Sequence, residues 1–411
     1  MTTRQDAAER LPRKERVPEL EMLRGIAILG VMMVHATSSA VVTVQNSLPR
    51  DAYIILNTFS LFCVPAFIFL SGFVLFYNYG DRPLTFSGLR TFYSKRFLQL
   101  IVPYAFVSLG YELVENALKH RSRESIEMLR LFGEHLLTGK AYPHLYYVAI
   151  TIQLYALFPI LLLLFQKLRL PVRLAVPLGF AVQWGFYLLN RNYWHMDAKG
   201  SWAFSYFAAF LIGAYLGMRS DRLAHWFRGS DGANRHRRAG MLTAAALLWL
   251  TATAGFLGMY IAYRTGASTP NGYWFEIGYN LFTVLTTLVL LFACFRLAKL
   301  RAARPLSAVL SDLGALSFGL YLVHPFFLLL YHRLKPASGQ PLVYHLWTAG
   351  GFVFALVASV LVLLLAHRYI RGAWLVLGQA PAKFRPKLES AAEAEAENGQ
   401  AADRRLTEAT E

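Results

Sequence analysis

Two polar residues in the first long apolar stretch are spaced so that they could act together in a reaction. Arg24 opens this stretch, and His35 follows eleven residues later. In an α-helix this separation covers about 16 Å and returns both side chains to within about 20° of one face. Arginine binds phosphate through charge-assisted hydrogen bonds, and imidazole exchanges protons near neutral pH. The pair therefore suits a phosphate-bearing substrate whose reactive end reaches His35.

Each residue also has a purely structural interpretation. Arg24 could anchor a membrane helix at the interface by snorkelling, and His35 could hold two helices together by a hydrogen bond. An ionisable side chain at the centre of a membrane helix costs about 2.5–3.5 kcal/mol on insertion scales, so a pair on one face requires an explanation. Ser39, one turn beyond His35, lies on or beside the same face and is a candidate for positioning a substrate.

A second histidine candidate is His324, in the segment SFGLYLVHPFF. Pro325 follows it and cannot donate a hydrogen bond to the carbonyl of Tyr321, so the helix is expected to open or kink there. His324 and Tyr321 could form the wall of a site, or the kink could be structural only.

Other polar residues lie at the ends of apolar stretches. His144 begins the fourth stretch at the outer interface, where an aromatic belt explains the neighbouring tyrosines without a function. Gln153 lies deeper and could bind a ligand or another side chain. Glu112 and Glu115 lie on one turn near the outer end of the third stretch. They could serve as acids or bases towards an outer substrate, but a solvated helix end is the simpler explanation.

Lys95 and Arg96 open the third stretch on the cytoplasmic side. They could anchor that helix in the membrane or recognise a phosphate. Among the soluble signatures, a nucleotide-binding glycine loop, HExxH, CxxC and GxSxG are all absent from the sequence. The histidines have no compact metal-ligand spacing, so no metal site is predicted.

Composition indicates which elements must position these residues. Of 411 residues 56% are hydrophobic and only 16% are charged, yet the net charge is +17. A soluble nucleic-acid-binding protein would account for the charge but not for the mean hydropathy of +0.38, and the basic residues are split among short segments, so no nucleic-acid partner is expected. The combination indicates a multi-pass membrane protein in the lipid bilayer of the cell (plasma or inner) membrane.

The predicted fold class is all-α, a polytopic transmembrane helix bundle of about ten spans. Each span needs about 20 apolar residues. The predicted spans are 25–44, 53–78, 97–118, 144–165, 174–190, 202–218, 240–263, 277–295, 314–331 and 345–366.

The basic residues predict the orientation of the bundle. With both termini cytoplasmic, 30 of the 41 Lys and Arg residues fall on the cytoplasmic side, which is a clear positive-inside bias. The loop 119–140 is an exception, and its segment SIEMLRLFGEHLL could form an amphipathic interfacial helix. Residues 1–17 are expected to form a basic cytoplasmic arm, 18–375 the membrane domain, and 376–411 a disordered cytoplasmic tail rich in Ala and Glu.

The first span carries a family resemblance. PELEMLRGIAILGVMMVHATS resembles the first-span signature of the acyltransferase type 3 family, with an acid (Glu21), an Arg-Gly pair (Arg24-Gly25) and a histidine eleven residues after the arginine (His35). The resemblance continues in order through VPAFIFLSGFVLF, FYSKRFLQLIVPY, HLYYVAITIQLYALFP and SFGLYLVHPFF. It covers most of residues 18–335.

The resemblance implies about ten spans and transfer of an acyl group, often acetyl, from cytoplasmic acyl-CoA to a carbohydrate hydroxyl. It implies that His35 is the catalytic residue and that Arg24 matches the family's first-span arginine. The family often has Arg-x-x-Arg at the start of the third span, whereas this chain has Arg96 followed by Gln99. The segment YFAAFLIGAYLG is similar to members that include exopolysaccharide O-acyltransferases.

The resulting hypothesis is an O-acyltransferase with acyl-CoA as co-substrate, no permanently bound cofactor, and a cell-surface or exported saccharide as acceptor. Arg24 and Arg96 would hold CoA phosphates with Lys95 assisting. His35 would be a general base or a transient acyl carrier. Ser39, Gln153, Tyr321 and His324 would position substrates, and Glu112, Glu115 and His144 would lie nearer the acceptor. The alternative is a transporter or flippase for a saccharide or a lipid-linked precursor.

Overall fold

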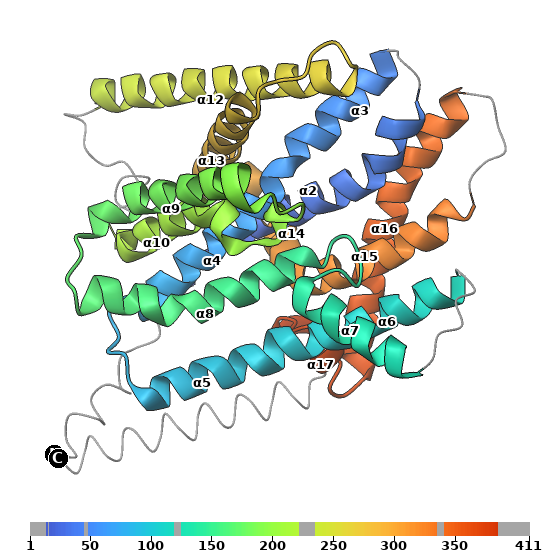
Figure 1. Ribbon diagram of the computed structural model, residues 1–411, viewed down its shortest axis with the longest axis horizontal. Helices are drawn as coiled ribbons and strands as arrows, with labels where there is room; N and C mark the ends of the chain where they lie inside the picture. Colours follow the sequence, from blue (N-terminus) through green and yellow to red (C-terminus); the bar gives the residue numbers. More distant parts are fainter. Residues whose placement is uncertain are drawn as a thin grey trace.

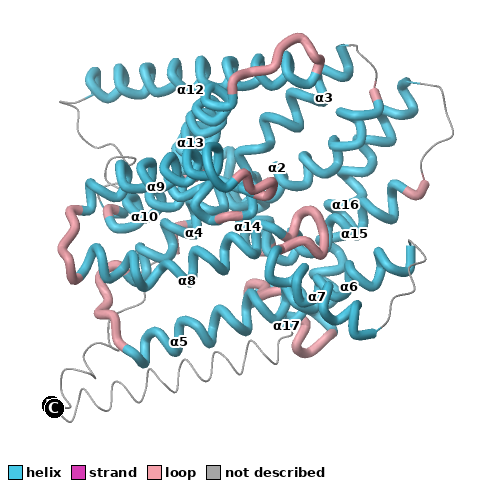
Figure 2. The backbone as a smooth tube through the Cα atoms, in the orientation of Figure 1, coloured by secondary structure: helices cyan, strands magenta, loops and turns pink. Residues whose placement is uncertain are grey.

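The computed structural model describes residues 14, 16–44, 48–118, 125–221, 235–334 and 341–384. These residues form helices joined by short connections, without a strand among them (Figures 1 and 2). The helices are α2 (Pro18–Thr43), α3 (Leu48–Phe59), α4 (Cys63–Tyr79), α5 (Phe86–Arg96), α6 (Val102–Leu118), α7 (Ser125–Thr138), α8 (Tyr146–Gln166), α9 (Ala175–Leu189), α10 (Phe207–Met218), α12 (Arg235–Arg264), α13 (Gly272–Leu297), α14 (Arg304–Ala315), α15 (Ser317–His332), α16 (Pro341–Tyr369) and α17 (Trp374–Leu377).

Eight of the ten predicted spans coincide with helices that, within the described residues, are long and apolar enough to cross a bilayer. Two of the eight each combine two α-helices. One span, Pro49–Tyr79, combines α3 and α4, and another, Phe86–Leu118, combines α5 and α6 through a π-helical turn at Phe97–Ile101. The all-α membrane bundle is therefore confirmed. The cytoplasmic placement of both termini stays a prediction.

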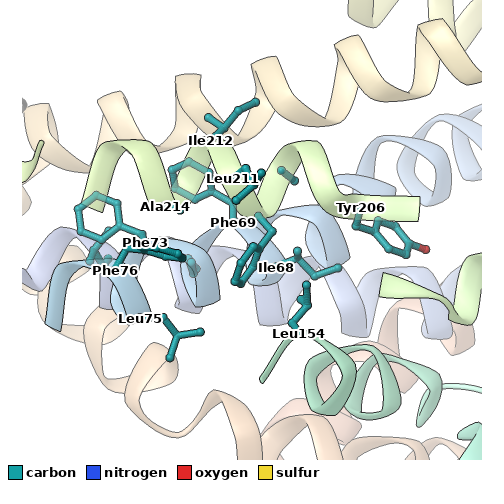
Figure 3. Packing of buried hydrophobic residues seen from close by; sticks show 14 of the residues in the cluster. Ile68, Phe69, Phe73, Leu75, Phe76, Leu154, Tyr206, Leu211, Ile212 and Ala214 are labelled. Atoms are coloured by element: carbon teal, nitrogen blue, oxygen red, sulfur yellow. The ribbon is translucent and has the colours of Figure 1, made fainter. Parts of the chain in front are cut away.

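The predicted span 202–218 is a shorter apolar helix, Ala203–Met218, at the centre of the protein. Its main part, α10, packs against α4 and α9. Large side chains such as Phe69, Phe73, Phe76 and Leu211 fill the interface between α4 and α10 (Figure 3). A helix enclosed in this way needs neither the length nor the interfacial ends of a lipid-facing span.

Small residues allow α4 and α10 to approach closely. A Cβ at Gly72 would collide with the carbonyl of Phe210, and one at Gly213 would collide with the carbonyl of Phe69. Close backbone contact through small residues is the usual way in which membrane helices pack.

The predicted ninth span, 314–331, is not a single straight helix. Helices α14 and α15 meet at Leu316 with a bend of 78°, whereas α15 continues through Pro325 as one element. The sharp bend therefore lies before the proline that was expected to cause it. At the bend α14 crosses α2 closely, because a Cβ at Gly314 would collide with the carbonyl of Glu21 and one at Gly25 with that of Leu310.

The remaining described parts of the structure are the helix in the loop 119–140 and the segment that follows α16. The loop 119–140 contains a helix, α7, as expected, and its position at the membrane interface stays a prediction. Residues 376–384, at the start of the predicted tail, pack on the bundle: Ala380 is buried, and Gly378 lies against the ring of Phe318. The apolar helix α17 contacts α6, and this contact holds the start of residues 376–384 against the bundle. Residues 1–13, 15 and 385–411, the rest of the predicted arm and tail, lie outside the described residues.

Candidate active site

Three histidines from distant parts of the chain meet inside the bundle. His35 belongs to α2, His144 precedes α8, and His324 belongs to α15 (Figure 1). The ring centroid of His35 lies 6.2 Å from that of His144 and 5.4 Å from that of His324, and the latter two are 5.8 Å apart. We call these residues the histidine cluster. The sequence places them 109 and 180 positions apart, so only the fold unites them.

The nitrogens of the cluster are largely unused by the protein. His324 donates from Nδ1 to the carbonyl of Leu320 at 2.8 Å, which leaves Nε2 as the lone-pair nitrogen. This Nε2 and both ring nitrogens of His144 are buried and make no hydrogen bond of normal geometry within the described residues. A buried polar atom left unpaired costs about 1–3 kcal/mol. Three such nitrogens around His35 indicate groups kept for chemistry rather than for stability.

The fold positions His144 and His324 firmly. The hydroxyl of Tyr321 donates to the carbonyl of His144, and the hydroxyl of Tyr111 donates to the carbonyl of Leu322 at 3.0 Å. The Tyr111 bond and the His324 bond use carbonyls in the helical turn that contains Pro325. These two bonds fix the turn on either side of Tyr321, the residue whose carbonyl Pro325 leaves without its helical donor.

His144, which is predicted at the outer end of the fourth span, is buried. Its exposed fraction is 1%, and the rings of Tyr111 and Tyr142 pack against it with centroids 5.2 and 5.5 Å away. Gly139, at φ +73°, turns the preceding loop inward so that its backbone lies against Tyr146. His144 is therefore a member of the cluster instead of a residue at its outer edge.

His35 and His144 line a cavity of about 150 Å³, here called the histidine cavity. Its other walls include Cys63, Tyr147 and Tyr321. Typical ligand pockets measure about 300–1,000 Å³, so this cavity holds the reacting end of a substrate rather than a whole one.

Arg24 and Arg96 line a second cavity of about 280 Å³, here called the arginine cavity. Arg24 is held by Glu21, with 3.0 Å between its Nη1 and the carboxylate Oε1. The guanidinium of Arg96 lies over the ring of Tyr155 at 4.9 Å and that of Phe92 at 5.5 Å. Contact with an aromatic face leaves the edge of a guanidinium free to donate hydrogen bonds.

Two tyrosines line both the arginine cavity and the histidine cavity. Tyr147 and Tyr321 line both of them, and their ring centroids are 5.5 Å apart. A ligand whose phosphates lie at Arg24 and Arg96 would therefore reach His35 by passing this tyrosine pair. Arg24 and His35 lie on neighbouring cavities along α2, as their spacing on one face predicts.

Lys95 does not join the two arginines. It is exposed and lines a separate cavity of about 410 Å³ together with Arg82, Thr85 and Phe92. In the arginine cavity the wall position one turn beyond Arg96 is taken by Gln99, the residue that replaces the second arginine of the family pattern.

Gln153 and Ser39 differ in whether the protein already uses their hydrogen-bonding groups. Gln153 donates from Nε2 to the carbonyl of Ser201 at 3.0 Å and accepts from the backbone N–H of Ala203 at 2.9 Å. Its amide is thus committed to holding the segment before α10. The Ser39 Oγ is buried without a hydrogen-bond partner among the described residues, so it keeps its capacity to bind.

The expectation of a solvated helix end fails for Glu112. Its exposed fraction is 6%, and its Oε2 lies 2.9 Å from Nδ1 of His135 on α7. Packing of α7 over α6 buries the carboxylate. Glu115 is half-buried near Tyr142. Burial raises the pKa of Tyr142, and the negative charge of Glu115 raises it further.

Sequence reasoning overlooked Tyr147, which was attributed to the aromatic belt. Its available signal was the spacing of Tyr147 and Thr151, four residues apart, which places both on one face of α8. Gln379 was also overlooked, because its role in the wall of the arginine cavity depends on the fold of residues after α16. Across the described residues no group of three or more His, Cys, Asp or Glu side chains is arranged to hold a metal ion.

The comparisons with known proteins give the class of protein. The profile of the acyltransferase domain family Acyl_transf_3 matches residues 17–364, most of the chain and all three histidines. The chain belongs to this family, the acyltransferase type 3 family, and is a multi-pass membrane acyltransferase. Comparison with curated proteins and with solved structures found no match.

Proposed function

We propose that the protein transfers a short acyl group, acetyl in the simplest case, from cytoplasmic acyl-CoA to a hydroxyl of a cell-surface or exported saccharide. The observation that supports this most directly is the pair of adjoining cavities. One is lined by the two arginines that suit phosphates, the other is lined by His35 and His144, and Tyr147 and Tyr321 line both. The long pantetheine arm of CoA separates its thioester from its phosphates in the same way.

The size of the histidine cavity supports a short acyl group. A volume of about 150 Å³ is below the range of about 300–1,000 Å³ typical of ligand pockets, so a thioester with a small acyl chain suits it better than a fatty acyl chain. The acceptor would therefore present only its hydroxyl to His35, with the rest of the saccharide outside the cavity.

In the proposed reaction His35 acts as the general base. The acceptor oxygen attacks the thioester carbonyl carbon while His35 removes the hydroxyl proton, the C–S bond breaks, and the proton passes to the CoA thiolate. The products are an ester and free CoA. His324 would position His35 from behind, because its ring lies 5.4 Å away with Nε2 unprotonated. A transient acyl group on a His35 nitrogen would give the same products in two steps.

The test combines binding with transfer. Purified protein is titrated with acetyl-CoA, and acetylation of surface polysaccharide is compared between a deletion strain, its parent, and the strain carrying His35→Ala. We expect binding to wild type and restoration of acetylation by wild type but not by His35→Ala, with equal amounts of both proteins in the membrane. Normal acetylation by His35→Ala would remove His35 from the mechanism.

Two further outcomes separate the alternatives. A transporter or flippase would not bind acetyl-CoA, so absence of binding would overturn the acyltransferase assignment for this substrate. Quenching a reaction that contains radiolabelled acetyl-CoA and no acceptor distinguishes the two roles of His35. Label on the protein supports the acyl carrier, and unlabelled protein with active turnover supports the general base.

A further inference from the structure

Another cavity adjoins the arginine cavity, next to Lys14 and Arg16. It measures about 510 Å³ and is here called the arm cavity. Lys14, Arg16 and Arg24 bring three cations to its walls. Arg24, Ala315 and Gln379 line both this cavity and the arginine cavity, so the two are continuous around Arg24.

The charge balance of the arm cavity favours an anion. Glu21 is the acidic residue on its described walls, and it already pairs with Arg24 at 3.0 Å. Lys14 lies 2.5 Å from Asp81, but the exposed fractions of these side chains are 34% and 75%. An ion pair as exposed as this contributes about 0–1 kcal/mol, so Lys14 can exchange its carboxylate for a phosphate at small cost.

The arm cavity also has the size and the lining groups for a nucleoside. Its volume lies within the range of small-molecule sites. Tyr77 on its wall presents a ring with the Lys14 Nζ 5.1 Å from the centroid, so an aromatic face and a cation adjoin each other. An adenine base and a ribose phosphate require this combination of groups.

We propose that the arm cavity binds the 3′-phosphorylated adenosine end of acyl-CoA, with Lys14 and Arg16 contacting the 3′-phosphate. This inference rests on the proposed function. The diphosphate of CoA would lie at Arg24 and Arg96, at the junction of the two cavities. The pantetheine arm would then run towards His35, and the adenosine would extend the other way, towards Lys14 and Arg16.

The 3′-phosphate provides a sharp test, because 3′-dephospho-CoA lacks only that group. The dissociation constants of CoA and 3′-dephospho-CoA are measured on the full-length purified protein and on the Lys14→Ala/Arg16→Ala double variant. Two charge-assisted contacts predict that wild type binds CoA roughly 10- to 100-fold more tightly than dephospho-CoA. In the double variant CoA should bind as weakly as dephospho-CoA, whose own affinity should not change.

Two control variants accompany the measurement. Arg301→Ala removes an exposed cation at the start of the turn before α14, and this variant should retain the full preference for CoA. Arg82→Ala/Lys95→Ala tests the neighbouring cavity that contains those two cations.

The outcomes separate failure of this inference from failure of the proposed function. Equal binding of both ligands to wild type, or an unchanged preference in Lys14→Ala/Arg16→Ala, would overturn the 3′-phosphate assignment and leave acyl-CoA binding intact. If only Arg82→Ala/Lys95→Ala loses the preference for CoA, the nucleotide binds in the cavity that those two cations line. That outcome would also overturn the 3′-phosphate assignment. If neither ligand binds to wild type, the proposed function itself fails.

Discussion

At the residue scale, the chemistry of this protein depends on where a few cations and imidazoles lie. Arg24, Arg96 and His35 line adjoining cavities, whereas Lys95, next to Arg96 in sequence, lines another. The difference follows from the helix, because successive residues point about 100° apart and neighbours can therefore face different cavities. Positive charge at a membrane interface is therefore no guide to phosphate binding until its direction is known.

Removing the Arg96 guanidinium should weaken donor binding more than turnover. We expect Arg96→Ala to raise the apparent KM for acetyl-CoA by about tenfold or more and to lower kcat less, because the contact to phosphate is the same in the ground and transition states. Steady-state kinetics with Arg96→Lys as a charge-conserving comparison measures this. An unchanged KM would reduce Arg96 to a topological anchor.

Gln99 allows a gain of function to be tested. It lines the arginine cavity at the position where related sequences often carry a second arginine. Gln99→Arg should lower the apparent KM for acetyl-CoA by roughly three- to tenfold through an added charge-assisted contact. Gln99→Met, of similar length but uncharged, is the matched control. A KM for Gln99→Arg no lower than that of wild type would show that the phosphates do not reach this wall.

At the element scale, the close crossing of α2 and α14 places Arg24 next to the bend at Leu316. Gly25 and Gly314 allow the two backbones to touch, and Ala315 then forms a wall shared by the arginine and arm cavities. Helices in a membrane gain little from the hydrophobic effect between them, so contact through small residues supplies much of the packing energy.

Filling this crossing should separate the helices. Gly314→Leu is expected to destabilise the protein by about 1–3 kcal/mol and to weaken acetyl-CoA binding, because its side chain would displace the backbone of α2. Thermal unfolding of the detergent-purified protein measures the first effect. Gly110→Leu, at an exposed position of α6 where a Cβ meets nothing within 4 Å, is the matched control and should keep the wild-type Tm. Equal Tm values for the two variants would contradict the close crossing.

At the scale of the whole molecule, the proposed reaction requires the arginine cavity to face the cytoplasm, where acyl-CoA is made. The charge bias of the loops predicts this orientation. The two native cysteines are buried, with exposed fractions of 4% for Cys63 and 1% for Cys294, so the wild-type chain offers little background to a thiol reagent.

Labelling of single introduced cysteines tests the orientation. Ser87 lies at the start of α5 and Ser268 lies between α12 and α13, and both are exposed. A membrane-impermeant maleimide should label Ser268→Cys in intact cells but Ser87→Cys only after permeabilisation. The opposite pattern would invert the topology and place the arginines away from the cytoplasmic donor.

Sequence alone was enough to predict the class of fold, the positions of eight spans, and the helix face that Arg24 and His35 share. Apolar length and helical periodicity are local properties, so reading along the chain is enough to find them. The same applies to the resemblance that names the family, whose motif lies within a single span. Where a prediction from the sequence was wrong, the cause was a contact between distant segments. The buried Glu112 and the bend at Leu316 are examples.

Only the tertiary structure decided which polar residues meet. It joined His144 and His324 to His35, committed Gln153 to the backbone before α10, and separated Lys95 from the two arginines. It also placed Tyr147 and Tyr321 between the two cavities. These facts depend on how helices distant in sequence pack and rotate against one another. That packing is governed by side-chain shape and small-residue contacts across the whole bundle, which no local pattern in the sequence records.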